Sequence, residues 1–272
     1  MVTQEQRRRQ LAREKFLRQQ QRRTAARRKA RVRNSVIASV LGVILVGSVA
    51  LYTSGVIKGD DDKTNASADT TPAASPTPVE DPCEKAAPGK VKEVSSKKEP
   101  AMTIDKSADY TLKLATTCGD IDIPLKTAAA PHTVNSFNYL AGKGYFDHTK
   151  CHRLTTNGIY VLQCGDPTGT GSGGPGYTIP DENLKDKSLK DNVYPAGTVA
   201  MANTSQPNTG GSQFFLVYQD SQLPPSYTPF GTVSAEGMKV LQKIAAAGEN
   251  TGAGDGAPNA TVVIDKATVS KS

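Results

Sequence analysis

The feature that most constrains what this chain can fold into is an uncharged run of 24 residues, 34–57. A helix rises about 1.5 Å per residue, so this run would reach roughly 36 Å, which is enough to cross a bilayer. Basic residues crowd its N-terminal side, whereas residues 58–62, KGDDD, follow on the other side. By the positive-inside rule, the run predicts a single-pass membrane anchor with a cytoplasmic N-terminus and an extracytoplasmic C-terminal body.

Two other interpretations of this run are a buried core helix and a cleaved signal peptide. A core helix rarely lacks charge over such a length. Ser48-Val49-Ala50 resembles the small-x-small site at which signal peptides are cleaved, but the 33 residues before the run form a long, charged leader for a signal peptide. The sequence therefore favours an uncleaved anchor, and a mature N-terminus near Leu51 would establish the alternative.

The formal net charge of +7 is concentrated at one end of the chain. Residues 1–33 hold 13 Lys and Arg against two acidic residues, while acidic residues outnumber basic ones in the remainder. Such an arm is typical of a segment that lies against anionic lipid. Phe16 is its only aromatic residue, so the arm has almost no side chains on which nucleic-acid bases could stack. No nucleic-acid partner is therefore expected. Eleven of the twelve arginines lie in this arm, which makes the exception, Arg153, a candidate functional residue.

Residues 58–102 follow the run and have the composition of a linker. Their first half is rich in Pro, Ser, Thr and Asp and nearly free of large apolar side chains, so it cannot offset the entropy of ordering. From about residue 103 the pattern becomes globular. The sequence thus predicts four segments: a basic cytoplasmic arm (1–33), a transmembrane helix (34–57), a disordered linker (58–102) and a folded domain (103–272).

Four cysteines, Cys83, Cys118, Cys151 and Cys164, all lie beyond the uncharged run. Their spacing lacks the paired C-x-x-C units of a structural zinc site, so no metal is expected. An extracytoplasmic location would permit disulfides, and at least one is predicted. Cys83 stands near the end of the linker, where a disulfide would staple it to the body. Four cysteines allow three complete pairings, and the sequence does not select one.

Residues 110–125 open the globular part as an antiparallel hairpin, because two alternating apolar runs flank a tight Cys-Gly-Asp turn. A helix is predicted from Pro131, which suits a helix start, to Gly142, which suits its end. A second helix is predicted between Ser234, a favoured N-cap residue, and Gly248. A further strand closes the chain. Many antiparallel strands with two helices predict a mainly-β domain, a β-barrel whose ends the helices cover.

The sequence offers few residues suited to nucleotide binding, metal binding or nucleophilic catalysis. Residues 169–174 satisfy G-x-G-x-x-G, but Pro175 follows where a dinucleotide site needs a helix. The three histidines, His132, His148 and His152, lie in different segments and are interpreted as structural or solvated. No serine stands in a G-x-S-x-G elbow. The sequence therefore predicts no cofactor and no metal, and it disfavours a hydrolase.

Two blocks remain, residues 151–167 and 196–233, and the second contains MAN followed by PNTGGSQFF. These blocks, with the helix segment 133–147, strongly resemble cyclophilins, the peptidyl-prolyl cis–trans isomerases. The resemblance covers roughly residues 105–268 and implies a closed, eight-stranded antiparallel β-barrel capped by two α-helices. With the arm, the uncharged run and the linker ahead of it, the chain resembles a membrane-anchored bacterial, actinobacterial-like member of the family.

The resemblance also implies roles for residues of the two blocks. Arg153 would engage the prolyl peptide bond, Gln163 would be its partner, and Asn203 would bind the substrate backbone. Phe215 would form the apolar floor of a proline pocket. The remaining substrate-binding positions implied by the resemblance are Tyr160, Val161, Ala202, Gln213, Leu223 and Tyr227.

Three departures from the family pattern accompany this assignment. Arg153 and Gln163 are separated by two more residues than in the familiar eukaryotic members, which affects the alignment of Tyr160 and Val161. One extra residue also stands in the stretch NTSQPNTGG. Gln222 occupies the position where a tryptophan favours cyclosporin, so the resemblance implies weak binding of that drug.

The same residues have an independent physical interpretation. Rotation about an Xaa-Pro bond breaks amide resonance against a barrier of about 18–20 kcal/mol. Off the plane, the proline nitrogen regains a basic lone pair, and a fixed donor such as Arg153 stabilises this twisted state more than either planar isomer.

The sequence therefore predicts a monomeric enzyme that isomerises Xaa-Pro bonds during the folding of secreted or cell-envelope proteins. Its partners would be proline-containing polypeptides and the membrane that residues 34–57 would span. The alternative is a catalytically weak proline-peptide binding or scaffold module. The joint presence of Arg153, Gln163, Asn203 and Phe215 favours the enzyme, because a module without activity would be expected to have lost at least Arg153.

Overall fold

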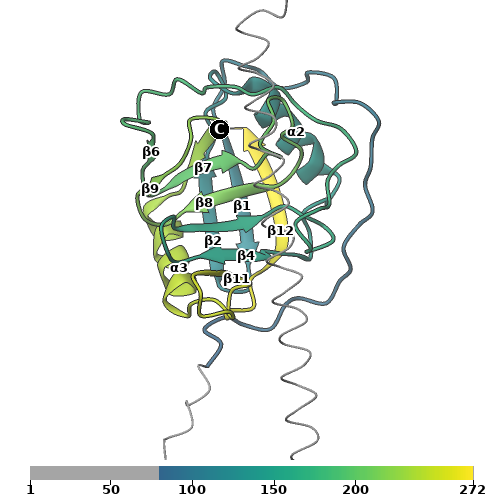
Figure 1. Ribbon diagram of the computed structural model, residues 1–272. Coiled ribbons are helices and arrows are strands. Elements are labelled where there is room, and N and C mark those ends of the chain that lie inside the picture. Colours follow the sequence, from purple (N-terminus) through teal and green to yellow (C-terminus); the bar gives the residue numbers. More distant parts are fainter. Residues whose placement is uncertain (1–79, 272) are drawn as a thin grey trace, which may run out of the picture. The chain divides into compact units, whose positions relative to one another are not determined.

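The computed structural model describes residues 80–271, so the basic arm, the uncharged run 34–57 and residues 58–79 lie outside the described residues. In the described part of the chain, no helix is both long and apolar enough to cross a membrane. The transmembrane anchor and the cytoplasmic arm therefore stay predictions. Figure 1 shows a body of strands with one helix, α2, near its top and another, α3, near its bottom.

The chain enters the body through the predicted hairpin, whose strands are β1 (Tyr110–Thr116) and β2 (Gly119–Pro124). Leu112 pairs with Ile123 and Leu114 pairs with Ile121 across the hairpin, and all four side chains are buried. Side chains alternate between faces along a strand, so this register places the apolar residues on one face. The alternation visible in the sequence therefore positions one wall of the core.

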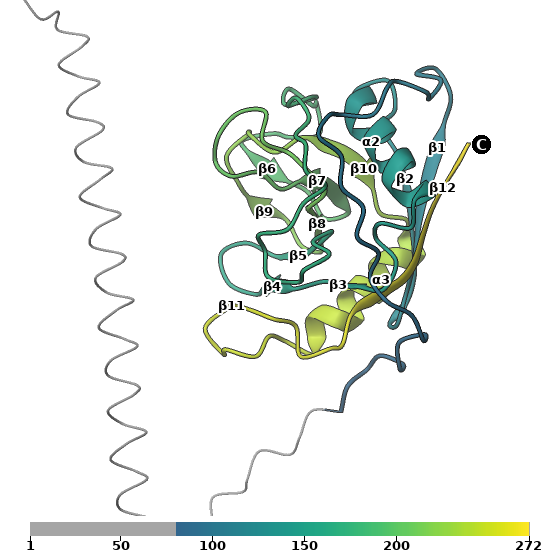
Figure 2. The same ribbon diagram turned by 90° about the vertical axis from the view of Figure 1, so that its right-hand side faces the viewer.

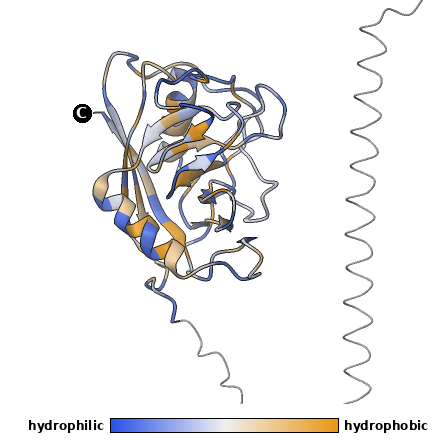
Figure 3. Cartoon of the chain, turned by 60° about the vertical axis from the view of Figure 1, so that its left-hand side comes forward, coloured by the Kyte–Doolittle hydropathy of each residue, from blue (hydrophilic) through white to orange (hydrophobic). Residues whose placement is uncertain are grey.

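The two predicted helices are α2 (Pro131–Gly142) and α3 (Ala235–Ala246). Pro131 begins α2, where its fixed φ suits the first turn. The Ser234 hydroxyl accepts a hydrogen bond from Gly237 N–H at 3.1 Å and caps α3, while Glu236 and Lys243 complement the helix dipole at its two ends. Figure 3 shows hydrophobic and hydrophilic residues alternating along α3, which packs on β2.

The described strands form three sheets in which every pairing is antiparallel. A four-stranded sheet has the order β2-β1-β12-β3, a six-stranded sheet has the order β10-β7-β8-β5-β4-β11, and β6 pairs with β9. The bounds of the remaining strands are β3 (Thr149–Lys150), β4 (Arg153–Thr155), β5 (Val161–Cys164), β6 (Val193–Tyr194), β7 (Thr198–Met201), β8 (Phe214–Val217), β9 (Ser221–Gln222), β10 (Pro229–Thr232), β11 (Asp255–Gly256) and β12 (Val263–Lys271).

The closed eight-stranded barrel that the resemblance implied is not found among the described residues. The two larger sheets share no continuous ladder, and a single bridge between Leu125 and Gly231 joins the end of β2 to β10. At this junction the register of β10 shifts between Pro229 and Gly231. At another point the chain leaves β3 of one sheet for β4 of the other through Cys151 and His152. Short, irregular strands interrupt the ladder, so the fold is mainly β with two helices.

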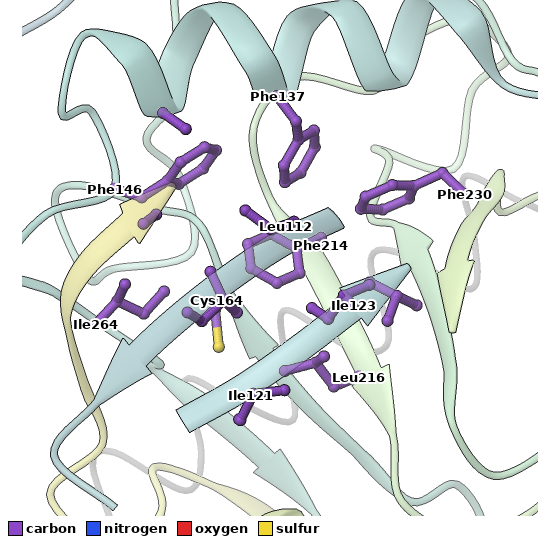
Figure 4. Close-up of a cluster of buried hydrophobic side chains, with 14 of the residues drawn as sticks. Leu112, Ile121, Ile123, Phe137, Phe146, Cys164, Phe214, Leu216, Phe230 and Ile264 are labelled. Carbon is purple, nitrogen blue, oxygen red and sulfur yellow. The ribbon is translucent and has the colours of Figure 1, made fainter. Parts of the chain in front are cut away.

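Aromatic side chains fill the core between the sheets and α2 (Figure 4). Phe137 of α2 packs against Phe146, Phe214 and Phe230, with ring centroids 5.2, 5.4 and 4.6 Å away. All four rings are fully buried. Offset and edge-to-face aromatic pairs of this kind each contribute roughly 0.5–1.5 kcal/mol beyond the burial of their area. The core therefore holds β8, the strand of Phe214, firmly against α2.

Residues 80–102 differ from their predicted place in a disordered linker. They form no helix or strand, but they run along the body as an extended segment, which we call the strap (Figure 2, dark blue). A disulfide between Cys83 and Cys118 joins the strap to the turn between β1 and β2. The strap is also held by hydrogen bonds, for example from Ala87 N–H to Asp265 Oδ1 at 3.0 Å. Its order thus depends on a covalent link and polar contacts, which composition does not reveal.

A second disulfide joins Cys151 and Cys164. The structure therefore selects one of the three possible pairings, and the prediction of at least one disulfide is confirmed. Cys151 lies two residues before the start of β4, and Cys164 is the last residue of β5. This disulfide consequently ties the two strands together next to Arg153 and Gln163, which pair across them.

Candidate active site

The six-stranded sheet carries a second apolar cluster, separate from the main core. On β8, Phe214 and Leu216 enter the core, so the alternation of side chains along a strand turns Phe215 and Val217 to the opposite face. On β5, Val161 joins Phe215 and Val217 in this second cluster. The packing of the core thus decides which face of the sheet presents Phe215.

One row of the strand register places two polar residues beside this cluster. Arg153 on β4 pairs with Gln163 on β5, and Gln163 pairs with Phe215 on β8. Residues directly opposite each other in antiparallel strands point to the same face, so these three side chains lie side by side. Three segments that are distant in the sequence therefore meet on one face of the sheet.

A cavity of about 220 Å³ opens at this row. Phe215, only 5% exposed, is its most buried aromatic residue. The volume is below the roughly 300–1,000 Å³ of pockets that hold drug-sized ligands, and it suits one small apolar group. Its lining contains eight of the ten residues that the resemblance assigned, namely Arg153, Val161, Gln163, Ala202, Asn203, Phe215, Leu223 and Tyr227, together with Ile159.

One wall of the cavity is Tyr227, whose ring lies edge-on to Phe215 with centroids 5.4 Å apart. Tyr194, which no sequence pattern singled out, supports this wall from below the surface. Its buried hydroxyl donates a hydrogen bond to the Tyr227 carbonyl at 2.9 Å. Burial raises the pKa of the Tyr194 phenol, so the group stays protonated and remains a donor at neutral pH.

A chain of side-chain hydrogen bonds runs from Arg153 into a neighbouring loop. Arg153 Nη1 donates to Gln163 Oε1 at 3.2 Å, and Gln163 Nε2 donates to Gln213 Oε1 at 2.9 Å. Gln213 Nε2 in turn donates to the Gly173 carbonyl at 2.9 Å. The side-chain amides of Gln163 and Gln213 each accept a hydrogen bond through the oxygen and donate one through the nitrogen, which fixes the orientation of both amide groups. Gln213 therefore lies outside this cavity and contacts the site through Gln163.

Arg153 has a second partner, Asp255 on β11, that no sequence pattern pointed to. Arg153 Nε donates to Asp255 Oδ1 at 2.7 Å and Nη2 donates to Oδ2 at 2.9 Å, which makes the pair bidentate. This hydrogen bonding raises the pKa of the Arg153 guanidinium and lowers the pKa of the Asp255 carboxyl. The Arg153 side chain is 38% exposed, so solvent screens the attraction and the main effect of the pair is to orient the guanidinium.

The loop that carries Asp255 is held from within. Glu249 accepts hydrogen bonds from the N–H groups of Thr251 and Gly254, at 2.6 and 2.8 Å. Thr156 N–H donates to the Gly254 carbonyl at 2.9 Å, which attaches the loop next to β4. Gly254 has a φ of +89°, a conformation that favours glycine. The carboxylate of Asp255 is therefore presented to Arg153 by an ordered segment.

Asn203 borders the cavity next to Ala202. Its side chain is engaged within the protein, because Nδ2 donates to the Ser226 carbonyl at 2.7 Å and Oδ1 accepts from Ser205 N–H at 3.0 Å. Within residues 80–271, the main-chain N–H and carbonyl of Asn203 form no hydrogen bond. These two main-chain groups are thus available to the backbone of a bound peptide.

Tyr160, which the resemblance placed in the wall, does not line the cavity. Its ring packs edge-on against Tyr218, with centroids 5.9 Å apart, and its N–H donates to Ser221 Oγ at 2.8 Å. Ile159 lines the cavity together with Val161 instead. In extended chain, residues 159 and 161 share a face and residue 160 points to the other. The longer segment between β4 and β5 therefore puts Ile159 in the wall.

None of the three histidines belongs to the lining of this cavity. His132 Nδ1 lies 2.7 Å from Glu99 Oε1, and burial lowers the pKa of His152, which keeps that ring neutral. In the part of the chain that the structure describes, no group of three His, Cys, Asp or Glu side chains is arranged to hold a metal ion. The site thus combines directed hydrogen-bond donors with a small apolar cavity.

Comparison with known sequences points to one family. A sequence model of the family described as "Cyclophilin type peptidyl-prolyl cis-trans isomerase/CLD" matches residues 111–269. The chain is 52% identical over 166 residues to "Probable peptidyl-prolyl cis-trans isomerase B" of Mycobacterium leprae, covering 58% of this chain and 56% of that protein. It is 49% identical over 165 residues to the protein of the same name from Mycobacterium tuberculosis, covering 58% and 53%. The chain therefore spans about half the length of these curated relatives.

Comparison with solved structures agrees with the sequence comparison. A cyclophilin type peptidyl-prolyl cis-trans isomerase of Cryptosporidium parvum matches with a TM-score of 0.50 and 27% identity, covering 60% of this chain and 99% of that chain. A crystal structure of the same protein in the presence of the dipeptide Ala-Pro matches with the same TM-score and 28% identity.

Proposed function

The chain belongs to the cyclophilin-type peptidyl-prolyl cis-trans isomerase family, and from this premise we propose that it catalyses cis–trans isomerisation of Xaa-Pro bonds in polypeptides. One observation carries the proposal. The guanidinium of Arg153 is held by Gln163 and Asp255 beside a small cavity lined by Phe215. A proline ring in that cavity would bring its peptide bond next to a positively charged donor.

The number of donors on Arg153 supports this role. A guanidinium has five N–H groups, of which Asp255 and Gln163 engage three through Nε, Nη2 and Nη1. One N–H on each of Nη1 and Nη2 remains without a protein acceptor in the described residues. The arginine is thus oriented by part of its donor set and retains two N–H groups for a substrate.

Catalysis follows from a difference in binding between the planar and twisted amides. The nitrogen lone pair of a planar Xaa-Pro bond is delocalised and a poor acceptor, whereas twisting the bond localises it. An oriented N–H from Arg153 therefore stabilises the twisted state selectively, which lowers the barrier in both directions. No covalent bond is made or broken, and no proton is transferred.

The rest of the site would hold the substrate in register. Phe215, Val161 and Tyr227 offer an apolar surface to the proline ring, since burial of apolar area favours binding. The free main-chain groups of Asn203 are positioned to hydrogen-bond an extended peptide beside it. Proline-containing polypeptides are therefore the proposed substrates.

The test is the turnover of an Xaa-Pro peptide by the purified full-length chain, measured with a protease that cleaves the trans isomer only. Without a catalyst the cis fraction converts over tens to hundreds of seconds. We expect the rate of this phase to rise in proportion to the concentration of the chain. Calorimetric binding of a proline peptide without any acceleration would instead support a binding or scaffold module.

The proposed place of action is outside the cytoplasm, with residues 34–57 as the anchor and residues 1–33 in the cytoplasm. The uncharged run and its basic flank support this arrangement, as do the two disulfides of the described residues, which are typical of oxidising compartments. Secreted and cell-envelope polypeptides are the clients that this location implies. The same proposal holds that the protein is monomeric and actinobacterial-like. The mycobacterial relatives support its actinobacterial-like character.

Extraction of membranes with alkaline carbonate tests the anchor. We expect the protein to stay in the membrane pellet, and protease added from outside to release the folded body. A mature N-terminus near Leu51 would show cleavage of a signal peptide and overturn the anchor, while leaving the isomerase proposal in place.

A further inference from the structure

A second, larger cavity of about 900 Å³ lies beside the first, and the two share Gln163, Ala202 and Asn203 in their linings. Further parts of its wall come from the Gly-rich segment 171–176 and from the strap. Glycines present no side chains, so this wall leaves room for a side chain of a bound polypeptide. The Gly-rich segment that fails as a dinucleotide motif thus forms part of a cavity next to the proposed proline site.

The strap is held in place where it borders this cavity. Ser96 N–H donates to the Pro175 carbonyl at 2.9 Å. The contact is close, because a Cβ on Gly176 would lie 2.7 Å from the Ser96 carbonyl oxygen. Further along, the Asn135 side chain donates to two strap carbonyls at 3.2 and 3.1 Å. Residues 97–98 lie between these two attachments, so their backbone is positioned at the cavity.

The charge at this border is positive. Lys97, Lys98 and Glu99 are the charged residues of the lining. Both lysines are exposed, and neither forms a salt bridge with a carboxylate of the described residues. Glu99 is engaged, because its Oε1 lies 2.7 Å from His132 Nδ1. Two ammonium groups are therefore available to a ligand in the cavity, against one carboxylate that already has a partner.

We propose that the second cavity is a subsite for an acidic side chain of the substrate polypeptide near the proline, and that Lys97 and Lys98 select it by charge. This inference rests on the proposed isomerase function. Attraction between exposed charges is weak and screened by salt, so it gives a preference of up to about 10-fold rather than strict specificity. The strap lies outside residues 111–269, so the preference is a property of the strap and not of the region that the family shares.

Charge-matched peptides test this preference on the full-length chain. Four-residue peptides carry Glu, Gln or Lys at one of three positions: two residues before the proline, directly before it, or directly after it. We expect kcat/KM for the Glu peptide to exceed that for the Lys peptide by about 5–10-fold at one position at low salt, and the ratio to shrink as salt is raised. A ratio within about 2-fold at all three positions would overturn the inference. Turnover of the Gln peptides reports the isomerase function separately.

Two double variants assign the preference to the cavity. Lys97→Gln with Lys98→Gln should reduce the ratio of Glu to Lys peptide to within about 2-fold. Lys90→Gln with Lys92→Gln is the matched control, because it removes the same charge from the same strap at positions that do not line the cavity. This control should keep the preference. An unchanged ratio in the first variant, or an equal loss in both variants, would show that Lys97 and Lys98 do not select the substrate.

Discussion

The two faces of the six-stranded sheet differ, although they alternate along the same strands. On one face, Phe214 and Leu216 are fully buried in the core. On the other face, Phe215 lies in a small cluster beside Arg153 and Gln163. Phe214 and Leu216 of β8 therefore contribute to stability, whereas Phe215, between them, borders the cavity.

The forces on the two faces differ as well. Core contacts among rings are non-directional and depend mainly on the apolar area removed from water. The hydrogen bonds around Arg153 are directional, and each needs its partner at a set distance and angle. Substitutions on the first face should consequently change stability, whereas substitutions on the second should change turnover more than stability.

A comparison of Phe214→Ala with Phe215→Ala tests this division most directly. Phe214 is fully buried among three other rings, so its removal should lower the free energy of unfolding by about 3–5 kcal/mol. Phe215 borders an existing cavity, so its removal should cost less stability but raise KM and lower kcat for Xaa-Pro peptides. Denaturant unfolding and the protease-coupled assay measure the two effects. Equal losses of stability would contradict the division between the faces.

Arg153→Ala should have the largest effect on turnover with little effect on folding. Loss of one preorganised donor typically lowers kcat/KM by about 10²–10³-fold. Arg153→Lys should recover only part of this loss, because a point ammonium keeps the charge but lacks the planar fork held by Gln163 and Asp255. Peptide binding should weaken much less than turnover, since the planar amide offers little lone pair to the donor. Circular dichroism controls for folding, and a fully active Arg153→Ala protein would exclude the mechanism.

Sequence patterns predicted the parts of this molecule that are periodic or that occur in specific motifs. Alternation predicted the hairpin of β1 and β2, and Pro131 and Ser234 marked the starts of the two helices. The motif blocks also contained most of the residues that line the small cavity. In these cases the signal is local, since the spacing of residues within one segment decides the outcome.

Contacts between distant segments left no such signal. Asp255 reaches Arg153 across 102 positions of sequence, from a loop that no motif marks. The strap has the composition of a linker, yet a disulfide and hydrogen bonds hold its residues 80–102 against the body. Closure of a barrel depends on short ladders at the junction of the sheets, where Gly231 makes one isolated bridge. These features follow from tertiary geometry and could not be derived from local patterns.

Substitutions of Asp255 test how far turnover depends on the orientation of the Arg153 guanidinium. Asp255→Ala should lower kcat by about 10-fold with little change in KM, because the guanidinium would keep its charge but lose the bidentate partner that orients it. Asp255→Asn should restore part of the activity, since one amide oxygen can still accept from Arg153. A purely structural role would instead reduce stability and leave kcat of the folded protein unchanged, with no rescue by asparagine.

The pH profile gives an independent test of the same pair. Arg153 lowers the pKa of Asp255 below its ordinary value of 3.8, so the carboxylate stays ionised at every pH above that value. The contribution of the pair is thus fully present above pH 3.8 and is lost only as the pH falls through the lowered pKa of the folded protein. We expect kcat/KM to be level from pH 8 to about pH 4. A decline centred between pH 5 and 7 would contradict the role of this ion pair.

The smallest expected effect distinguishes two neighbouring residues at the edge of the cavity. Ile159 lines the cavity, whereas Tyr160 packs against Tyr218 on the other side of the chain. Ile159→Ala should raise KM by about 2–5-fold, because it removes roughly three methylene-sized groups from a wall that a bound proline only partly covers. Tyr160→Ala should leave KM within 2-fold of the unaltered chain, although loss of the aromatic pair should lower the free energy of unfolding by roughly 1 kcal/mol. The opposite ranking of the two KM values would place Tyr160 in the wall, as the family pattern implied, and would mean that the longer segment after β4 adopts another register when substrate is bound.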